Sequence, residues 1–388
     1  MELDFDNNYI SITTTLRLNR SHPYIKRDIK WILTFIVMEG IFTLVFVLLM
    51  YNIFQHNLKS NDFSQMCSNG VLGVMYFVTS FEYIILVWHQ DAIVGIINDI
   101  KRDYKETDKM NTYEKEVVYK YVKISKWVCK QWVVLGISGN TGFIVKSITL
   151  MCYYYWIDDF KFVGMYDLFY PTYIENNKDK VPVFLMTYAL ILFFGLFGAS
   201  LYTGFVPLGP IFILHACAQL DLVKKRIEDL FLVDDNEEVR KKLKFIIERI
   251  HRDKNPNVFQ YKKLTLYFCS YVDRVNDVFK TCYEMTLKGT TIMLPVACYQ
   301  VLEVCITGFN GGQIMNIPFS APCYYSDLLM EKGEDVRLAI YSCGWEKQYD
   351  RRTRTTLQLM LQHALSPIAM HSIFTTLCLE ALTDVCLN

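Results

Sequence analysis

The sequence lacks any net charge, because 40 lysine and arginine residues are balanced by 40 aspartate and glutamate residues. A polyanion partner requires a basic surface, so this balance gives no support for a nucleic-acid-binding protein. The sequence also lacks the Gly-Ser-rich and Pro-rich tracts that act as linkers. With 52% hydrophobic and 21% charged residues, the composition excludes a disordered or fibrous chain. A large globular enzyme and a polytopic membrane protein remain.

Signatures of catalysis are absent as well. There is no HExxH, GxSxG, GxxxxGK, GxGxxG or CxxC pattern, each of which places chemically active groups at a fixed spacing. His215 and Cys217 are the closest His and Cys pair, but alternate positions of a helix point to different faces. We therefore expect no enzyme activity, no catalytic residue, no metal site and no cofactor.

What the sequence does contain is a set of long apolar runs. A helix needs about 20 mostly apolar residues to cross the hydrocarbon of a bilayer, and one run here extends for 35 residues without a charge. Ordinary core helices are much shorter than that. The seven runs are Trp31–Phe54, Gly70–Trp88, Trp127–Cys152, Val181–His215, Glu284–Gly308, Phe309–Met330 and a last one from near Leu357 to the C-terminus. They predict an all-α, polytopic membrane protein with seven transmembrane helices.

Four charged residues lie well inside these runs, namely Glu39, Glu82, Lys146 and Lys288. A charge at the bilayer centre costs about 3 kcal/mol or more unless it is paired or hydrated. The sequence leaves two interpretations open: an ion path or interhelical pair, and side chains that reach toward the membrane surface.

Lysine and arginine are distributed unevenly between the segments that join the runs. Of the 40 basic residues, 33 lie before the first run and in alternate connections, and only 4 lie in the remaining connections. The other 3 lie inside the runs. Cytoplasmic loops collect basic residues. We therefore expect a cytoplasmic N-terminus and, with seven spans, an extracellular C-terminus. This orientation is the reverse of that of G-protein-coupled receptors.

The longest connection, residues 216–283, has helical periodicity. Apolar residues recur at spacings of three and four, and they form two sets: Leu220, Val223, Ile227 and Leu230, and then Val239, Leu243, Ile246 and Ile250. Two amphipathic helices are expected, and each apolar stripe needs a partner in the same chain or in another subunit.

The C-terminal third resembles the signature of insect odorant receptors. The matching positions are Ala339, Tyr341 and Trp345 in AIYSCGW, then Arg351, Arg352, Leu357, Leu361 and Pro367, and the segment LCLEALTDV at 377–385. His215 and Gln219 at the end of the fourth run are also similar to that family. The chain length, the seven apolar runs and the expected cytoplasmic N-terminus agree with the resemblance.

The resemblance implies a subunit of a ligand-gated, nonselective cation channel. Such a subunit assembles as a heterotetramer with the odorant receptor coreceptor (Orco), in the plasma membrane of olfactory sensory neuron dendrites, and binds a small volatile organic ligand. The seventh helix, with Leu382 and Val385, would line the pore. Only 18 residues run from His371 to Asn388, so this helix is expected to be short.

The resemblance and the runs together divide the chain into segments. Residues 1–30 form a cytoplasmic N-terminal segment, and 31–215 carry the first four spans with an outer-half ligand pocket. Residues 216–283 form a cytoplasmic helical anchor, and 284–330 carry the fifth and sixth spans. Residues 331–367 complete the anchor, and 368–388 form the pore-lining helix.

A pocket for a volatile ligand should offer aromatic and Met surface with few polar groups. The outer-half positions of this kind are Tyr76, Phe77, Gly139, Phe143, Phe194, Phe197, Met293 and Tyr299. They are chosen by depth, and packing against lipid or core is the alternative role for each. Two other functions stay open: a gustatory receptor of the same superfamily, and a membrane transporter. Cys67 and Cys152 could form a disulfide, although free thiols are the simpler expectation.

Overall fold

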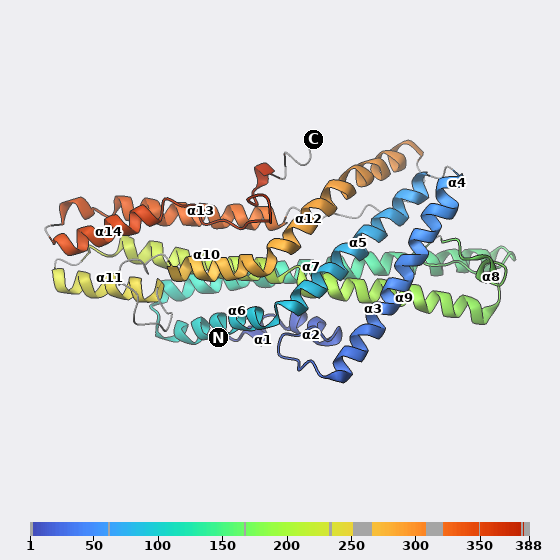
Figure 1. Ribbon diagram of the computed structural model, residues 1–388, viewed down its shortest axis with the longest axis horizontal. Helices are drawn as coiled ribbons and strands as arrows, with labels where there is room; N and C mark the ends of the chain where they lie inside the picture. Colours follow the sequence, from blue (N-terminus) through green and yellow to red (C-terminus); the bar gives the residue numbers. More distant parts are fainter. Residues whose placement is uncertain are drawn as a thin grey trace.

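The chain folds into an elongated bundle of α-helices (Figure 1). The structure is a computed structural model that describes residues 3–60, 63–166, 168–232, 235–250, 266–307, 321–348, 350–381 and 383. Within these residues there is no β-strand, and one isolated bridge joins His371 to Thr376. The predicted all-α class is confirmed for the described part of the chain.

The helices vary greatly in length. The short N-terminal and connecting helices are α1 (Phe5–Asn8), α2 (Ile10–Leu18), the π-helix η1 (Ile53–Asn57), α4 (Leu58–Ser60), the 3₁₀-helices η2 (Thr107–Lys109) and η4 (Trp345–Lys347), and α8 (Thr172–Glu175). The longer helices are α3 (Ile29–Asn52), α5 (Phe63–Trp88), α6 (Gln90–Glu106), α7 (Thr112–Trp156), α9 (Val181–Phe205), α10 (Leu208–Glu228), α11 (Asn236–Ile250), α12 (Leu266–Thr307), α13 (Ala321–Ser342) and α14 (Arg351–His363).

Among the described residues, four helical stretches are long and apolar enough to cross a membrane. They are 29–60, 63–88, 112–156 and 181–228, and they correspond to the first four predicted spans. The fifth predicted span lies within α12, while residues 308–320 lie outside the described residues and the rest of the sixth run lies in α13. Seven spans and the orientation of the termini therefore stay predictions.

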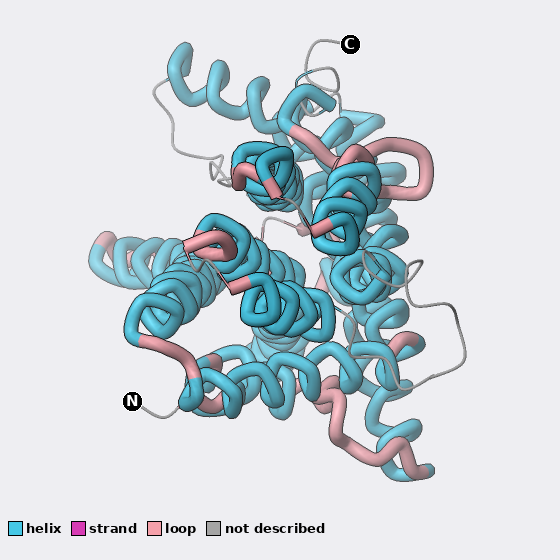
Figure 2. Tube along the Cα trace, turned by 90° about the vertical axis from the view of Figure 1, so that its left-hand side faces the viewer, coloured by secondary structure: helices cyan, strands magenta, loops and turns pink. Residues whose placement is uncertain are grey.

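The long axis of the molecule exceeds the thickness of a bilayer. α7 has 45 residues, which at 1.5 Å per residue gives a length of about 68 Å. A bilayer with its headgroups is only about 40–45 Å thick, so one end of α7 must extend beyond it. That end lies beside α10, α11, α13 and α14 on the left of Figure 1, whereas α3, α5 and α9 lie at the other end. Figure 2 looks along this axis and shows several helices nearly end-on and others that cross them, in agreement with the inclined α3, α5 and α12 of Figure 1.

Helix ends do not coincide with the predicted segment boundaries. The charge-free fourth run ends near His215, but the helix breaks earlier, between α9 and α10, where Pro207 cannot donate a backbone hydrogen bond. α10, α12 and α13 each continue across a boundary that hydropathy placed at 215, 283 or 330. Hydropathy marks where a helix leaves an apolar environment, and the backbone hydrogen bonds of a helix continue through that point.

The N-terminal segment is folded, which the sequence analysis did not predict. Tyr9, Ile12 and Leu16 are buried and share one helical face, and α2 packs against α9. The Tyr9 hydroxyl lies 3.2 Å from the hydroxyl of Tyr104 on α6, and burial raises the pKa of Tyr9 to about 12. The apolar spacing of three and four residues was a signal of this helix, but the polar composition of residues 1–30 obscured it.

The predicted pore helix at 368–388 begins later than expected. Residues 367–378 are not helical, and a turn there is closed by Ser372 N donating to the Thr375 carbonyl at 2.8 Å. Leu377 N donates back to the Met370 carbonyl at 2.9 Å, and both of these side chains are fully buried. These contacts hold the segment against the bundle, so helical residues start only at Leu379. Leu382 and Val385 lie outside the described residues.

A capping box starts the longest helix. The Asn111 Oδ1 accepts a hydrogen bond from Glu114 N at 2.8 Å, and Asn111 N donates to the Glu114 Oε2 at 3.3 Å. These bonds satisfy two donors that a helix N-terminus leaves free.

We expect Asn111→Ala to destabilise the protein by about 1 kcal/mol, because the alanine cannot accept that bond. The thermal unfolding midpoint of the purified full-length chain would measure the loss. Asn111→Asp keeps an acceptor and should retain most of the stability. Equal losses for the two variants would contradict a capping role.

Candidate functional site

Five aromatic side chains from three helices pack together in the apolar half of the molecule. This aromatic cluster consists of Phe42 and Phe46 on α3, Tyr76 on α5, and Phe194 and Phe197 on α9. The Phe42 ring centroid lies 4.8 Å from Tyr76, 4.7 Å from Phe194 and 5.3 Å from Phe197. Phe46 stacks on Tyr76 at 4.3 Å. The structure therefore brings three predicted pocket residues, Tyr76, Phe194 and Phe197, into one group.

The aromatic cluster contains one fixed polar group. The Tyr76 hydroxyl forms a hydrogen bond of 2.7 Å with the Thr43 hydroxyl. The Thr43 hydroxyl in turn donates a hydrogen bond of 2.7 Å to the backbone carbonyl of Glu39. A largely apolar surface with one oriented hydroxyl is what a small organic ligand requires for both affinity and orientation. Phe42, Phe46 and Thr43 were missed by the sequence analysis, which chose no pocket residue from the first run.

Phe143 reaches the aromatic cluster through one intermediate ring. It packs edge-on against Tyr166 at 4.6 Å, and Tyr166 lies 6.5 Å from Phe194. Tyr166 comes from the loop between α7 and α8 and is 7% exposed, so a loop residue completes this wall. Gly139, by contrast, has no described side chain within 4 Å of the position that a Cβ would take.

The other three predicted pocket residues lie elsewhere. Phe77 is 53% exposed, so it points away from the aromatic cluster although it follows Tyr76 directly. Met293 on α12 is buried against Val71 in a separate small group, and Tyr299 packs edge-on against Phe63 at 4.9 Å. Met293 and Tyr299 thus belong to the α5–α12 contact. The structure does not bring these three residues to the aromatic cluster, and their part in ligand binding stays a prediction.

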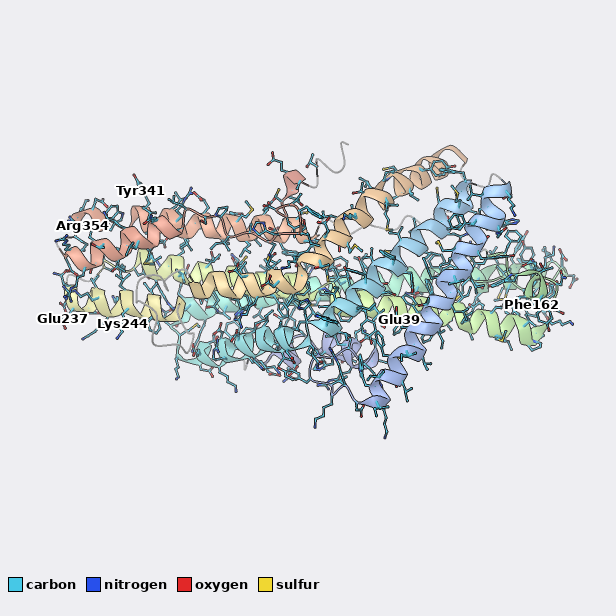
Figure 3. The ribbon with its side chains drawn as sticks, in the orientation of Figure 1. Glu39, Phe162, Glu237, Lys244, Tyr341 and Arg354 are labelled. Atoms are coloured by element: carbon cyan, nitrogen blue, oxygen red, sulfur yellow. The ribbon has the colours of Figure 1, made fainter. Side chains whose placement is uncertain are left out.

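The predicted motif residues are spread along the opposite half of the molecule. His215 Nε2 lies 3.1 Å from the Asp103 Oδ2, and both side chains are mostly buried. Ala339 is buried, while Tyr341 is 67% exposed and points outward (Figure 3). Gln219 is partly exposed on α10, Trp345 lies on η4, and Pro367 follows α14 and is exposed. They do not form a single site.

Arg351 and Arg352 are exposed in the first turn of α14, and the residue before them makes the stronger contacts. The Asp350 carboxylate accepts hydrogen bonds from Arg240 Nε and Nη2, both at 2.8 Å, and from the Thr353 hydroxyl at 2.6 Å. The hydrogen bonds from Arg240 and Thr353 hold the pKa of Asp350 well below its usual range. Asp350 therefore both caps α14 and joins it to α11.

Ion pairs join α7, α10 and α13 in the same half. The Tyr121 hydroxyl donates to Asp221 at 2.6 Å, and Lys332 lies 3.6 Å from Asp221 and 3.1 Å from Asp335. Lys224 reaches Asp335 at 3.3 Å. Burial raises the pKa of Asp335, but the hydrogen bonds and charges of Lys332 and Lys224 outweigh it, so the net pKa lies below its ordinary value.

The amphipathic stripes of the long connection pack within the chain. Leu220, Ile227 and Leu230 are buried at α10 and its end, and Val239, Leu243 and Ile246 are buried on α11. Both predicted helices are confirmed. In the described residues, no group of three or more His, Cys, Asp or Glu side chains could hold a metal ion, and Cys67 and Cys152 are free thiols.

The sequence of this helical chain matches a known family. The model of the 7tm Odorant receptor family matches residues 62–387. The chain belongs to the odorant receptor family. It is accordingly a membrane receptor and not an enzyme. No curated protein matches the sequence.

Two solved structures of an insect odorant receptor share the fold. The olfactory receptor OR5 from Machilis hrabei in complex with eugenol has a TM-score of 0.70 and 12% sequence identity, with coverage of 97% of this chain and 94% of that one. The structure of OR5 from the same insect, with no ligand in its description, has a TM-score of 0.61 and 12% identity, covering 98% and 96%. The likeness therefore extends over nearly the whole of this odorant receptor.

Proposed function

We propose that this odorant receptor binds a small, volatile, mostly apolar ligand at the aromatic cluster and gates a nonselective cation channel. It does so in a heterotetramer with the odorant receptor coreceptor, in the plasma membrane of olfactory sensory neuron dendrites. The observation that carries the proposal is the aromatic cluster itself, where rings from α3, α5 and α9 meet around the single bonded hydroxyl of Tyr76. Family membership and the eugenol complex of the similar receptor support it.

Ligand binding acts on the channel by shifting a population of conformations. Phe42 and its neighbours are tightly packed at centroid distances of 4.7–5.3 Å, so an odorant has to separate α3, α5 and α9 to lie among them. A ligand moves an equilibrium only by its difference in affinity for the two states. The open state is therefore the one in which these helices stand further apart.

The ion-paired helices α7, α10, α13 and α14 serve as the cytoplasmic anchor of the assembly. Asp221, Lys332 and Asp335 join α7, α10 and α13, and Asp350 joins α14 to α11 through Arg240. The pore lining by Leu382 and Val385 remains a proposal from the family resemblance.

Currents in a cell line without endogenous receptors test the proposal. The chain is expressed with and without the coreceptor, and an odorant panel is applied. We expect ligand-evoked cation currents with the coreceptor and none without it. Ligand currents from the chain alone would contradict the heterotetramer, and surface-expressed complexes silent to the whole panel would contradict the receptor function.

A pair of adjacent substitutions locates the ligand site. Tyr76→Ala should raise the half-maximal odorant concentration at least about tenfold, equivalent to about 1.4 kcal/mol of binding energy, because Tyr76 lies inside the aromatic cluster. Phe77→Ala removes a similarly large side chain from the exposed side of the same helix. It should change the half-maximal odorant concentration less than about twofold. Surface labelling controls for expression. Equal shifts for the two variants would place the ligand elsewhere.

A further inference from the structure

A small internal cavity lies on the other face of α5 from the aromatic cluster. It has a volume of about 40 Å³ and lies between α5, the α9–α10 junction and α12, with Pro322 of α13 at its edge. Its polar lining consists of Thr79, Glu82, Tyr202, Tyr283 and Thr286. Neither the pocket prediction nor the proposed odorant site includes any of these residues.

Glu82 is a buried carboxyl group inside an apolar helix. It is 8% exposed, and its Oε1 accepts a hydrogen bond of 3.1 Å from the Thr286 hydroxyl. Within the described part of the chain, no Lys, Arg or His lies within ion-pair distance of it. Glu284 on α12, two residues before Thr286, differs because Lys288 lies 3.1 Å from it. An isolated carboxylate in a low-dielectric site is strongly unfavourable, so Glu82 needs a positive partner or a proton.

Tyr283 lines the same cavity and is fixed in place by its contact with α10. Its side chain is 5% exposed, and its hydroxyl has no hydrogen-bond partner among the residues that the structure describes. A Cβ at Gly209 would lie 2.5 Å from this hydroxyl oxygen, so α10 admits the phenol only because residue 209 is glycine. The glycine therefore lets the Tyr283 phenol pack against α10, where its hydroxyl oxygen is covered, while the residue lines the cavity.

The remaining walls are aromatic and aliphatic. Phe205, Phe279 and Tyr202 contribute rings, and Met75 and Val78 close the side toward α5. Aromatic faces together with one carboxylate are the surroundings that favour an ammonium group, because the ring quadrupole attracts a cation that the carboxylate neutralises. A divalent metal ion would need about six oxygen ligands, whereas a single carboxylate lines this cavity.

We propose that this cavity binds a small protonated amine. The ammonium group pairs with Glu82, while its short alkyl part contacts Phe205 and Phe279. A cavity of about 40 Å³ accommodates an ammonium or methylammonium ion. Since Glu82 lies on α5 and both Tyr283 and Thr286 lie on α12, the bound amine ties these two helices together beside the α9–α10 junction.

Thermal stability of the purified full-length protein in phosphatidylcholine nanodiscs tests the proposal without any need for channel activity. Methylammonium chloride is titrated against sodium chloride and tetramethylammonium chloride at equal ionic strength. We expect methylammonium to raise the unfolding midpoint by at least about 2 °C. Tetramethylammonium has no N–H donor and is too large, so it should act like sodium.

Two carboxyl substitutions separate this site from nonspecific effects of the ion. Glu82→Gln should weaken the methylammonium response at least tenfold in midpoint concentration. Glu39→Gln changes another carboxyl within an apolar helix, labelled on α3 in Figure 3, which does not line the cavity, and it should respond like the unsubstituted protein.

Two outcomes overturn the proposal: no rise specific to methylammonium in the unsubstituted protein, or an unchanged response in Glu82→Gln. If Glu82→Gln fails to give folded protein, Phe279→Leu decides. It removes one aromatic face from the cavity wall, and it should weaken the response severalfold. An unchanged response in that variant would equally overturn the proposal.

Discussion

Replacing Arg226 by alanine should destabilise the receptor by about 3–5 kcal/mol, the usual cost of leaving one partner of a buried ion pair alone. Arg226 Nε donates to the Glu114 Oε1 at 2.6 Å, and each of the two side chains is only 12% exposed. The guanidinium also lies 5.1 Å from the ring centre of Phe245. Arg226 therefore joins the ends of α7, α10 and α11. The unfolding midpoint of the purified protein and its yield at the cell surface should both fall.

The neighbouring residue supplies a matched control. Lys225 pairs with Asp229 at 3.0 Å, but these side chains are 35% and 44% exposed. Exposed pairs contribute little, so Lys225→Ala should lower the unfolding midpoint far less than Arg226→Ala. Arg226→Lys keeps the charge but loses the planar guanidinium group that binds the carboxylate. Its loss of stability should fall between those of the two alanine variants. If Lys225→Ala were as damaging as Arg226→Ala, burial of the pair would not be the cause.

Phe42→Ala should produce the second large loss. Phe42 is 1% exposed and touches Tyr76, Phe194 and Phe197 with its ring. Truncating a fully buried Phe costs about 3–5 kcal/mol in water-soluble cores. In a membrane the transfer term is small because lipid is as apolar as the core, so we expect about 2–3 kcal/mol from lost packing alone. Thermal unfolding in detergent measures it.

Ile36 lies on the same helix and is 59% exposed, so it faces lipid and not a neighbouring helix. Ile36→Ala should lower stability by less than about 1 kcal/mol. The contrast separates packing inside the aromatic cluster from a general sensitivity of α3 to alanine. A loss for Ile36→Ala as large as that for Phe42→Ala would show that α3 is damaged by any truncation.

The candidate site was only partly predictable. Position along the apolar runs selected Tyr76, Phe194 and Phe197, which the structure brings into one cluster, because a helix rises 1.5 Å per residue and equal depth puts side chains at one level. Depth says nothing of the direction in which a side chain points. Successive residues are rotated by about 100°, so Tyr76 faces inward and Phe77 outward.

Contacts between distant segments were also beyond the reach of the sequence. Tyr166 closes one wall of the aromatic cluster from a loop, and Asp350 pairs with Arg240 across 110 positions. The Glu82 carboxyl was recognised as unusual, but its cavity is formed by Tyr283 and Tyr202 from other helices. Chain connectivity alone does not bring such residues together.

The helical class, the first four apolar helices, the two amphipathic helices of the long connection and the family can all be predicted from the amino-acid sequence. These follow from periodicity, run length and motif spacing, which are local properties. Which side of each apolar helix faces protein is known only from the packing of the folded chain. The amphipathic helices α10 and α11 lie between water and the protein core, which differ in polarity. Their apolar residues therefore mark the buried face in the sequence. In α3, α5 and α9, lipid and protein are equally apolar, so only the fit of side chains selects the face.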